Sequence, residues 1–463
     1  MLTKLHLKNF KAWKDTGSIR LAPLTVIFGA NSAGKSSLGH LLLALKQTAL
    51  STDRKRTLHL GDDGSLIDLG TFADCLHGHD LTNRLDFGLS WSLPKPLEVR
   101  DPLQSSQSPR YQGDQLKLEV SLFAGKSGQP EVQSLHYDLA NKDGVVLDVD
   151  LSRGENRKFS LNSEHYRFVM ADGRKWPLEE PEKFYRVSEI SMARFKNASF
   201  LTDFALATET MLGSLSYLGP LRKHPQRTYQ WSGDTPEGVG QMGENAIAAI
   251  LAAQNEGRKL NRGPKRSLQP FAEFIAGWLK DLGVIHSFVV KPVAEGRKEY
   301  EVLVKTHAMA PEVKITDVGF GISQVLPVLV QAFYCQPNST IWMEQPEIHL
   351  HPQVQAELAD VFISAIHSRE DGKARNVQLI VESHSEHFLN RLQLRIAEGE
   401  IAPDDVAIYF CKRAGSATEL EPLEVNLYGD IENWPENFFG DEMADLTART
   451  VAAMDRRQKE KAK

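Results

Sequence analysis

Cysteine is scarce in this chain, and long apolar segments are missing. The 463 residues include three cysteines, Cys75, Cys335 and Cys411, and no two of them form a CxxC pair. This excludes a disulfide framework and a zinc knuckle, and it fits a reducing cytosol. No run reaches the roughly 18 consecutive apolar residues that cross a membrane. The N-terminal stretch MLTKLHLKNFKAWKD has charges within its apolar pattern, unlike a signal peptide. We therefore expect a cytoplasmic protein without a membrane partner.

The chain also lacks an excess of basic charge. Its 54 lysines and arginines are outnumbered by 60 acidic residues, giving a net charge of −6. A chain that mainly coats nucleic acid would be basic, so a nucleic-acid contact would need a local patch. The 41% of apolar residues excludes disorder as the dominant state. At about 150 residues per domain, the length predicts two or three domains.

Apolar periodicity predicts an α/β core with a long interruption. Residues 84–174 alternate as an antiparallel β region does, and residues 181–282 show helical patterns. The polar stretch Pro102–Gln112 is expected to be a loop. The core elements expected on either side are strands over 5–10, 24–28, 339–343, 377–381 and 406–410, and helices over 35–50 and from Pro352.

The segment GANSAGKS, Gly29–Ser36, satisfies the pattern GxxxxGK[ST] between an expected strand and helix. Backbone N–H groups at a helix N-terminus hold phosphate, and glycines let the backbone bend sharply. In this motif Lys35 reaches the β- and γ-phosphates and Ser36 ligates Mg²⁺; the alternative is a fortuitous glycine turn. The predicted site binds ATP and Mg²⁺ through Gly29, Asn31, Ser32, Ala33, Gly34, Lys35, Ser36 and Ser37.

Two later segments carry candidate catalytic groups. IWMEQPEIHLHP is an apolar strand that ends in Glu344, which would complete the Mg²⁺ site beside Ser36. The alternative for Glu344 is a surface carboxylate. VESHSEH places His384 at the end of another buried strand, where it can hydrogen-bond a γ-phosphate. For a lone histidine, however, a structural role is the better interpretation.

The segment DVGFGISQ precedes an apolar helix and offers a second anion site at a helix N-terminus. Its candidate residues are Gly319, Gly321, Ser323 and Gln324. The alternative is ordinary capping of the helix, with Ser323 as the N-cap residue.

The order of these motifs resembles the head of ABC-type ATPases of the RecF, SMC and OLD class. NFKAW and GANSAGKSSL look like theirs, GFGISQ stands in place of LSGGQ, and EQPEIHLHP stands in place of the Walker B motif and D-loop. The resemblance covers residues 1–60 and 300–412. LLALKQ, DLGTFADCLHGHD, YLGPLRKHPQRTY and WPENFF resemble a narrower bacterial phage-defence subfamily, like AriA of PARIS or PtuA of Septu.

The resemblance implies an α/β ABC-type P-loop ATPase head with an antiparallel β subdomain and a helical insertion. It implies that the signature segment acts in trans, so that ATP is sandwiched in a head-to-tail dimer or larger assembly. It also implies a separate nuclease effector encoded nearby and a phage protein as trigger. The expected parts are the P-loop half of the head (1–83), a β-rich subdomain (84–180), a helical insertion (181–286), the second half of the head (287–415) and a C-terminal extension (416–463).

Two departures from the family pattern bear on catalysis. Most ABC ATPases have a catalytic glutamate after the Walker B acid, but here Gln345 follows Glu344. An amide can orient water but cannot deprotonate it at neutral pH. Either Glu347 acts instead or hydrolysis is slow, so the catalytic candidates are Glu344, Gln345, Glu347 and His384. The Q-loop glutamine has no clear counterpart, because Gln47 lies on the P-loop helix.

Other interpretations remain open at this point. A RecF-like repair ATPase would use the basic loop with Arg258, Lys259, Arg262, Lys265 and Arg266, which is more often a solvated connection. A nearly inactive nucleotide-dependent scaffold would explain Gln345, whereas a transporter subunit fits the large insertion poorly. His349, His351, His384 and His387 lie near Glu344, Glu347, Glu382 and Glu386, but without a metal-site spacing such as HExxH. No Toprim-like acidic cluster follows His384, so the chain is not expected to be a nuclease.

Overall fold

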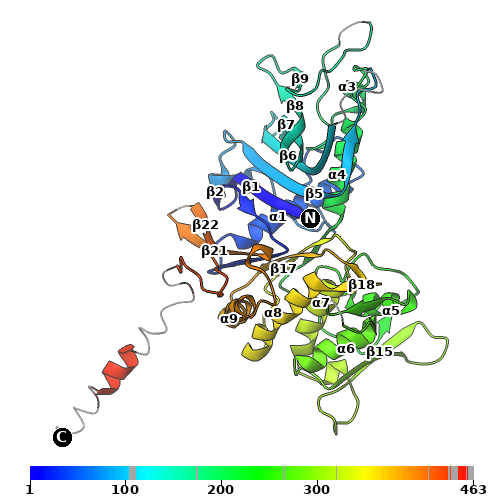
Figure 1. Cartoon of the computed structure of the whole chain (residues 1–463), viewed down its shortest axis with the longest axis vertical. Coiled ribbons are helices and arrows are strands. Elements are labelled where there is room, and N and C mark those ends of the chain that lie inside the picture. Colours follow the sequence, from blue (N-terminus) through cyan, green and yellow to red (C-terminus); the bar gives the residue numbers. More distant parts are fainter. Residues whose placement is uncertain are drawn as a thin grey trace.

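The computed structural model describes residues 1–103, 111–173, 176–263, 266–319, 321–415, 417–435, 438, 447–454 and 456. Within them a parallel sheet lies between an antiparallel sheet and a group of helices (Figure 1). The antiparallel sheet forms the upper part of that view, and helices α5 to α8 lie in the lower part. The predicted α/β class with an antiparallel β subdomain is confirmed.

The central sheet brings together five parallel strands from distant parts of the chain, with one antiparallel strand at an edge. Its P-loop strand and the two strands that carry the candidate acids are buried along their whole length. Strands covered on both faces are typically continuous apolar runs, as these are. In spatial order the strands are β10 (Leu215–Leu218), β17 (Thr340–Glu344), β20 (Gln378–Glu382), β4 (Leu24–Gly29), β21 (Val406–Ala414) and β22 (Ala417–Leu423).

The antiparallel sheet starts with the N-terminal strand and continues through the predicted β region. Its long strands alternate buried and exposed residues, because one face packs on the core. The order is β2 (Trp13–Asp15), β1 (Leu2–Phe10), β5 (Leu85–Val99), β6 (Tyr111–Ala124), β7 (Pro130–Asn141), β8 (Gly144–Arg153) and β9 (Phe159–Asn162), with β3 (Ile19–Arg20) also paired to β1.

Two small sheets and the helices complete the described structure. One small sheet contains β11 (Tyr229–Gln230), β15 (Glu299–Lys305), β14 (Ser287–Pro292) and β16 (Val313–Lys314), and the other contains β13 (Gln269–Pro270), β12 (Lys259–Asn261), β18 (Arg369–Glu370) and β19 (Lys373–Ala374). The helices are α1 (Lys35–Leu50), α2 (Phe72–Cys75), α3 (Glu189–Met192), α4 (Leu201–Gly213), α5 (Ala246–Asn255), α6 (Phe271–Asp281), α7 (Gly321–Tyr334), α8 (Pro352–His367) and α9 (Glu386–Ala397), with short 3₁₀ turns at His77–His79, Ile315–Asp317 and Pro403–Asp405.

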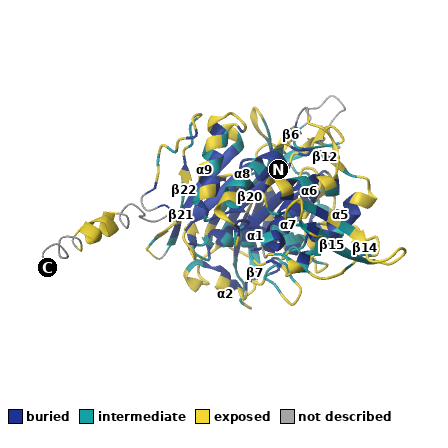
Figure 2. Cartoon of the chain, turned by 90° about the horizontal axis from the view of Figure 1, so that it is seen from below, coloured by how far each residue is buried: buried dark blue, intermediate teal, exposed yellow. Residues whose placement is uncertain are grey.

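The parallel sheet separates two hydrophobic cores. Successive strand residues point to opposite faces, so Trp342 and Ile380 join one core while their neighbours Met343 and Val381 join the other. The first core contains α1, α4 and the antiparallel sheet, and the second contains α5 to α9. The strands and the inward faces of the helices are buried in Figure 2, and the outer faces are exposed. The P-loop helix α1 is therefore fixed between the two sheets.

A tight contact between α1 and β17 yields the first prediction. A Cβ atom added to Gly39 would lie 2.6 Å from Nε1 and 2.8 Å from Cδ2 of Trp342, which is fully buried. Overpacking of a core typically costs about 1–3 kcal/mol, so Gly39→Val should lower the free energy of unfolding by about that amount in urea titrations. Gly213→Ala is the matched control, because its added Cβ meets nothing within 4 Å among the described residues. Unchanged stability of Gly39→Val would contradict this packing.

Strand pairing crosses the boundaries of the predicted parts of the chain, and the division itself stays a prediction. The helices expected between residues 181 and 286 are present, but strands of the same region belong to sheets of the head. β10 is an edge strand of the parallel sheet, β11 pairs with β15, and β12 pairs with β18. Likewise β1, from the expected P-loop half, pairs with β5 of the expected β subdomain. Sequence periodicity identifies the elements, but only tertiary pairing decides which of them share a sheet.

Some predictions lie outside the described residues, wholly or in part. These are Lys265 of the basic loop, most of the loop expected over Pro102–Gln112, and much of the C-terminal extension expected over 416–463. Among the described residues, the helices fall short of the length and apolarity needed to cross a membrane.

Candidate functional site

The predicted P-loop joins β4 to α1, and two of its glycines are required by geometry. Gly29 has φ +142°, and an added Cβ would lie 2.7 Å from Cβ of Cys411 on the neighbouring strand β21. Gly34, the N-cap of α1, has φ +92°, a left-handed conformation that side chains disfavour. Ser32 is also left-handed, with φ +60°. The loop therefore bends as the motif predicts, directly before the N-terminus of a 16-residue helix.

Neighbouring strands support the loop from outside. Trp13 Nε1 donates to the Gly34 carbonyl at 3.1 Å and to Ser37 Oγ at 2.9 Å. Thr418 Oγ1 donates to the Ala33 carbonyl at 2.8 Å. Ser37, predicted as an ATP-binding residue, thus has a structural hydrogen bond in this structure.

The Lys35 ammonium group folds back onto the loop. Its Nζ donates to the carbonyls of Gly29 and Ala30, both at 2.9 Å. Burial lowers the pKa of Lys35, and the nearby carboxylates of Glu382, Glu347 and Glu344 oppose this shift. A cation held by two weak carbonyl acceptors is available for exchange onto a phosphate, which offers charge-assisted bonds instead.

Two acids end adjacent parallel strands beside the P-loop. Glu344 of β17 and Glu382 of β20 are register partners. Ser36 Oγ donates to Glu382 Oε2 at 2.7 Å, whereas Glu344 Oε1 accepts from the Tyr217 hydroxyl at 2.9 Å. His40 Nε2 lies 3.7 Å from Glu344 Oε1. The acid that Ser36 contacts is therefore Glu382, and the role of Glu344 in a Mg²⁺ site beside Ser36 stays a prediction.

Glu382 is held in a low-dielectric position. It is 1% exposed, and Trp342 Nε1 donates to its Oε1 at 2.8 Å. Burial and the neighbouring Glu344 raise the pKa of Glu382 to about 8, against the opposing effect of its donors Ser36 and Trp342. Without a bound divalent cation, burial and Glu344 therefore favour the protonated form of Glu382.

Glu347 and His384 meet at the same edge of the sheet. Glu347 is buried and accepts the backbone N–H of His384 at 2.6 Å, and burial raises the pKa of Glu347. Burial and the charge of Lys35 lower the pKa of His384 to about 4, so its imidazole is neutral. Glu347 Oε2 and His384 Nε2 are both buried and have no hydrogen-bond partner within the described part of the chain.

Gln345 takes part through its backbone. It has φ +44°, and its N–H donates to the Glu382 carbonyl at 2.9 Å. This strained conformation turns the chain at the end of β17, between the two acids Glu344 and Glu347. The four catalytic candidates therefore lie at one edge, although none of these positions tests their predicted roles.

The residues present fit a magnesium–nucleotide complex. Buried polar atoms without partners are rare, and an unbound ligand or water is a common reason for them. Lys35 and the loop N–H groups would hold the phosphates, and oxygens of Ser36, Glu344 and Glu382 are donors that suit Mg²⁺. When bound, this ion neutralises charge on the β- and γ-phosphates.

The predicted signature segment starts helix α7. Gly321 is the first residue of the helix, and a Cβ added to Gly319 or Gly321 meets nothing within 4 Å in the described structure. Ser323 is the third residue of the helix and is 5% exposed, so it is not the N-cap residue considered above. Its hydroxyl accepts from Gln324 Nε2 at 3.3 Å. The two glycines, not Ser323, form the accessible part of this segment.

Gln47 has a structural role. Its Nε2 donates to the carbonyls of His59 and Ile67, at 2.7 and 3.1 Å, and its Oε1 accepts the N–H of Ile67. The amide thus fixes the chain after α1 onto that helix and does not take the place of a Q-loop glutamine.

The alternative of a histidine-rich metal centre finds no support in the described residues, where no three histidine, cysteine or acidic side chains form a metal-binding group. His351 instead caps α8, accepting the N–H of Gln353 at 3.3 Å. His349 lies in the turn before it, with φ +61°.

Two arginines of the basic loop form ion pairs within the chain. Arg258 bonds both oxygens of Glu370, at 2.7 and 3.1 Å, and Arg262 bonds Asp281 at 2.6 Å. The Arg262 guanidinium also lies 3.9 Å from the ring centroid of Trp278. Two of the arginines proposed for nucleic-acid binding therefore already have anionic partners, while Lys259 and Arg266 are exposed.

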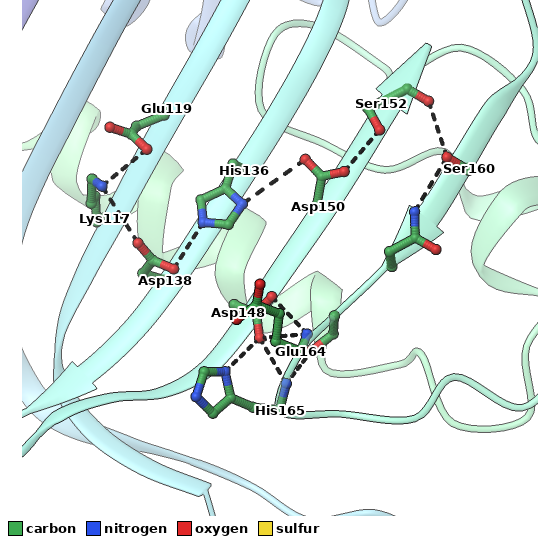
Figure 3. Close-up of polar contacts among 12 residues, drawn as sticks. Lys117, Glu119, His136, Asp138, Asp148, Asp150, Ser152, Ser160, Glu164 and His165 are labelled. Carbon is green, nitrogen blue, oxygen red and sulfur yellow. Dashed lines mark hydrogen bonds and ion pairs between the residues drawn. The ribbon is translucent and has the colours of Figure 1, made fainter. Parts of the chain in front are cut away.

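A polar network on the antiparallel sheet is structural as well (Figure 3). Lys117 pairs with Glu119 and Asp138, and His136 pairs with Asp138 at 2.9 Å. Asp148 accepts the backbone N–H groups of Glu164 and His165, and its pKa is lowered to about 2 by these and its side-chain donors despite partial burial. The network cross-links strands and the segment after β9, and its charges satisfy one another.

Sequence reasoning underrated Glu382 and missed Tyr217 and Trp342. Glu382 carried the same signal as Glu344, an acid at the end of an apolar strand, but was considered only for a histidine-rich metal centre. The two aromatic residues gave no local signal, because their role is to place a donor on an acid of a neighbouring strand.

Comparison with known proteins supports an ATPase-like domain over part of the chain. Residues 241–389 match the family model of the AAA ATPase domain, and residues 401–448 match a protein family of unknown function, DUF3696. The first match includes α7, β17 and β20 but begins after the P-loop. No curated protein matches the chain.

Among solved structures, heads of SMC proteins are similar. An Smc head bound to the C-terminal winged-helix domain of ScpA has a TM-score of 0.44 and 12% identity, covering 92% of this chain and 98% of that one. The SMC head domain from Thermotoga maritima has a TM-score of 0.40 and 12% identity, covering 92% and 99%. A Pyrococcus furiosus Smc head with an extended coiled coil and bound to the C-terminal domain of ScpA has a TM-score of 0.39 and 11% identity, covering 91% and 96%. The fold assignment rests on the sheet order and on the P-loop between β4 and α1.

Proposed function

We propose that this chain is an ATP-binding and ATP-hydrolysing switch of the ABC type that uses Mg²⁺. The observation that carries the proposal is the Ser36–Glu382 hydrogen bond, which joins the P-loop helix to the strand that lies between the P-loop strand and the strand of Glu344. Lys35 and the neutral His384 lie at the carboxyl edge of the parallel sheet. The three carboxyl groups there belong to Glu344, Glu347 and Glu382. A site with these groups binds the phosphates, holds the cation and keeps an imidazole near the reacting end.

Hydrolysis in this proposal depends on Glu347 rather than on Gln345. A general base works best when its pKa lies near the operating pH, and burial moves Glu347 in that direction. Its free Oε2 is the atom that would accept the proton of water. Gln345 would only orient the water, so turnover is expected to be slow.

We further propose that ATP drives assembly of two or more copies. The signature segment would complete the nucleotide site of a neighbouring copy through Gly319 and Gly321, whose surroundings are open. Ser323 and Gln324 support this segment from within α7. Binding and hydrolysis would then switch the assembly on and off.

The biological output in this proposal is control of a separate nuclease effector in antiphage defence, with a phage protein as trigger. The support is the sequence resemblance given above, together with surface that a nucleotide switch alone does not need, such as the antiparallel sheet beyond β5. The RecF-like repair alternative loses support, since Arg258 and Arg262 bind acidic partners within the chain.

Gly319→Arg tests the assembly. Because an added side chain meets nothing nearby at this exposed position, the variant should fold and bind ATP with wild-type affinity. It should fail to form the ATP-dependent species seen by mass photometry, since the arginine would block the neighbouring copy. Gly213→Arg is the matched control, exposed and equally open but preceding the amino end of β10, and it should assemble normally.

Two other outcomes of the assembly and hydrolysis measurements would reject a part of the proposal. Assembly of Gly319→Arg at wild-type levels would reject the trans role of this segment. ATP-dependent assembly of the wild type without measurable phosphate release would instead favour the nearly inactive scaffold, for which Gln345 is the supporting observation.

A further inference from the structure

A buried arginine without a partner lies beside the candidate site. Arg222 follows β10 and is 7% exposed, yet Nε, Nη1 and Nη2 all lack a hydrogen-bond partner within the described residues. A guanidinium has five N–H donors and is always charged in proteins. Leaving all of them unpaired in the interior is costly, so a structural role alone does not explain this side chain.

The backbone fixes Arg222 in place. On one side of it the Gly219 N–H donates to the Gln241 carbonyl at 2.8 Å, and on the other the Lys223 N–H donates to the Met242 carbonyl at 2.9 Å. These hydrogen bonds fix the backbone on both sides of Arg222. The guanidinium is nevertheless left without a hydrogen-bond partner among the described residues.

Charged groups of the candidate site act on Arg222. Glu344 and Glu347 act on it electrostatically, as does the hydroxyl of Tyr217, which itself hydrogen-bonds Glu344. Neither acid hydrogen-bonds Arg222. The guanidinium is thus within electrostatic reach of two acids of the candidate site, and its three nitrogens have no hydrogen-bond partner among the described residues.

The strand order indicates which part of a nucleotide Arg222 would meet. The P-loop follows β4, while Arg222 follows β10, which lies beyond β20 and β17 on the side of Glu344. The loop N–H groups hold the inner phosphates, and the metal site with Ser36 lies between the β- and γ-phosphates. The Arg222 guanidinium, on the far side of Glu344 from the P-loop, is therefore expected to lie near the terminal phosphate of a bound nucleotide.

We propose that Arg222 binds the terminal phosphate of a nucleoside triphosphate and makes the site prefer triphosphate over diphosphate. The inference rests on the proposed function, because it places the nucleotide at the P-loop. A guanidinium offers two parallel N–H bonds to phosphate oxygens, which the three unpaired nitrogens of Arg222 can supply.

Calorimetric titration of the full chain with Mg²⁺ and either ADP or a non-hydrolysable ATP analogue tests this. Arg222→Gln should weaken the triphosphate analogue at least tenfold and ADP less than twofold. Arg227→Gln is the control in the same loop, because that exposed arginine bonds Asp317 at 3.0 Å, and it should leave both affinities unchanged. Equal losses for both nucleotides, or no loss for either, would overturn the proposal.

Thermal unfolding without nucleotide separates this role from a structural one. Removing an unpaired buried charge should leave the Tm of Arg222→Gln unchanged or raise it, whereas a Tm lowered by several degrees would mean a structural arginine. Should Arg222→Gln fail to fold, Arg222→Lys keeps the charge but loses the planar fork, and it should still lower the preference for triphosphate. Wild-type protein that binds neither nucleotide would reject the proposed function itself, while an unchanged preference in either variant would reject only the role of Arg222.

Discussion

Lys35→Ala is expected to lower the affinity for Mg²⁺–ATP by at least a hundredfold. The Lys35 ammonium makes two hydrogen bonds to loop carbonyls that a phosphate can replace with charge-assisted bonds. Hydrogen bonds to charged groups contribute about 1.5–3 kcal/mol each. Two of them give roughly 3–6 kcal/mol, and about 1.4 kcal/mol corresponds to a factor of ten in affinity. Removal also takes away the cation that offsets Glu344, Glu347 and Glu382.

Calorimetric titration with ATP and Mg²⁺ measures this effect, with Lys280→Ala as the control at an exposed position in the last turn of α6. The fold should persist in the Lys35 variant, because the two released carbonyls belong to the P-loop, where Ala30 is exposed to water. Wild-type affinity in a folded Lys35→Ala protein would mean that the P-loop does not hold the nucleotide.

Several helices and strands of this fold are predictable because the apolar pattern within each segment specifies them. The helix expected over residues 35–50 runs from Lys35 to Leu50, and the strands expected near 24–28 and 377–381 are β4 and β20. Each is specified by an apolar run between turn residues, so the chain around it adds little. Pro352 at the start of α8 follows the same rule, since its fixed φ suits the first helical turn.

The features that the sequence did not reveal depend on strand pairing. Glu382 becomes the partner of Ser36 because β20 lies between β4 and β17, an order that no local pattern encodes. The short strand β10 was hidden in a helical region, although it brings Arg222 to the site. Ser323 was misjudged as a possible cap because α7 already begins at Gly321, which makes Ser323 the third residue of the helix.

The same pairing gives the site its sensitivity to pH. In β17 and β20 two carboxyl groups end neighbouring strands, and the charge of Glu344 together with burial raises the pKa of Glu382. A divalent cation reverses this, because each carboxylate then has a positive partner. We therefore expect binding of a divalent cation to release a proton from Glu382.

Glu382→Gln is expected to abolish most of the pH dependence that the site contributes. The pKa of Glu382 is raised to about 8 in the folded protein, above its ordinary value of 4.5. The stability that its proton provides is therefore fully present below about pH 4.5 and is lost as the pH rises through 8. At one pKa unit per 1.36 kcal/mol, the wild type should lose roughly 2 kcal/mol relative to the variant between pH 6.5 and 8. Because His384 has a pKa lowered to about 4, it is neutral throughout that range and does not contribute.

Scanning fluorimetry of the nucleotide-free protein at several pH values between 6.5 and 8.5 measures this loss of stability with rising pH. Calorimetry in buffers of different ionisation enthalpy measures the proton release expected when Mg²⁺–ATP binds at pH 7, because the raised pKa of Glu382 favours its protonated form until a cation binds. Glu382→Gln should remove both the loss of stability with rising pH and the proton release. Glu273→Gln replaces an exposed acid in the first turn of α6 and should retain both. Proton release that is the same in Glu382→Gln as in the wild type would show that another group loses the proton, and Glu347, whose pKa is also raised by burial, would be the next to replace.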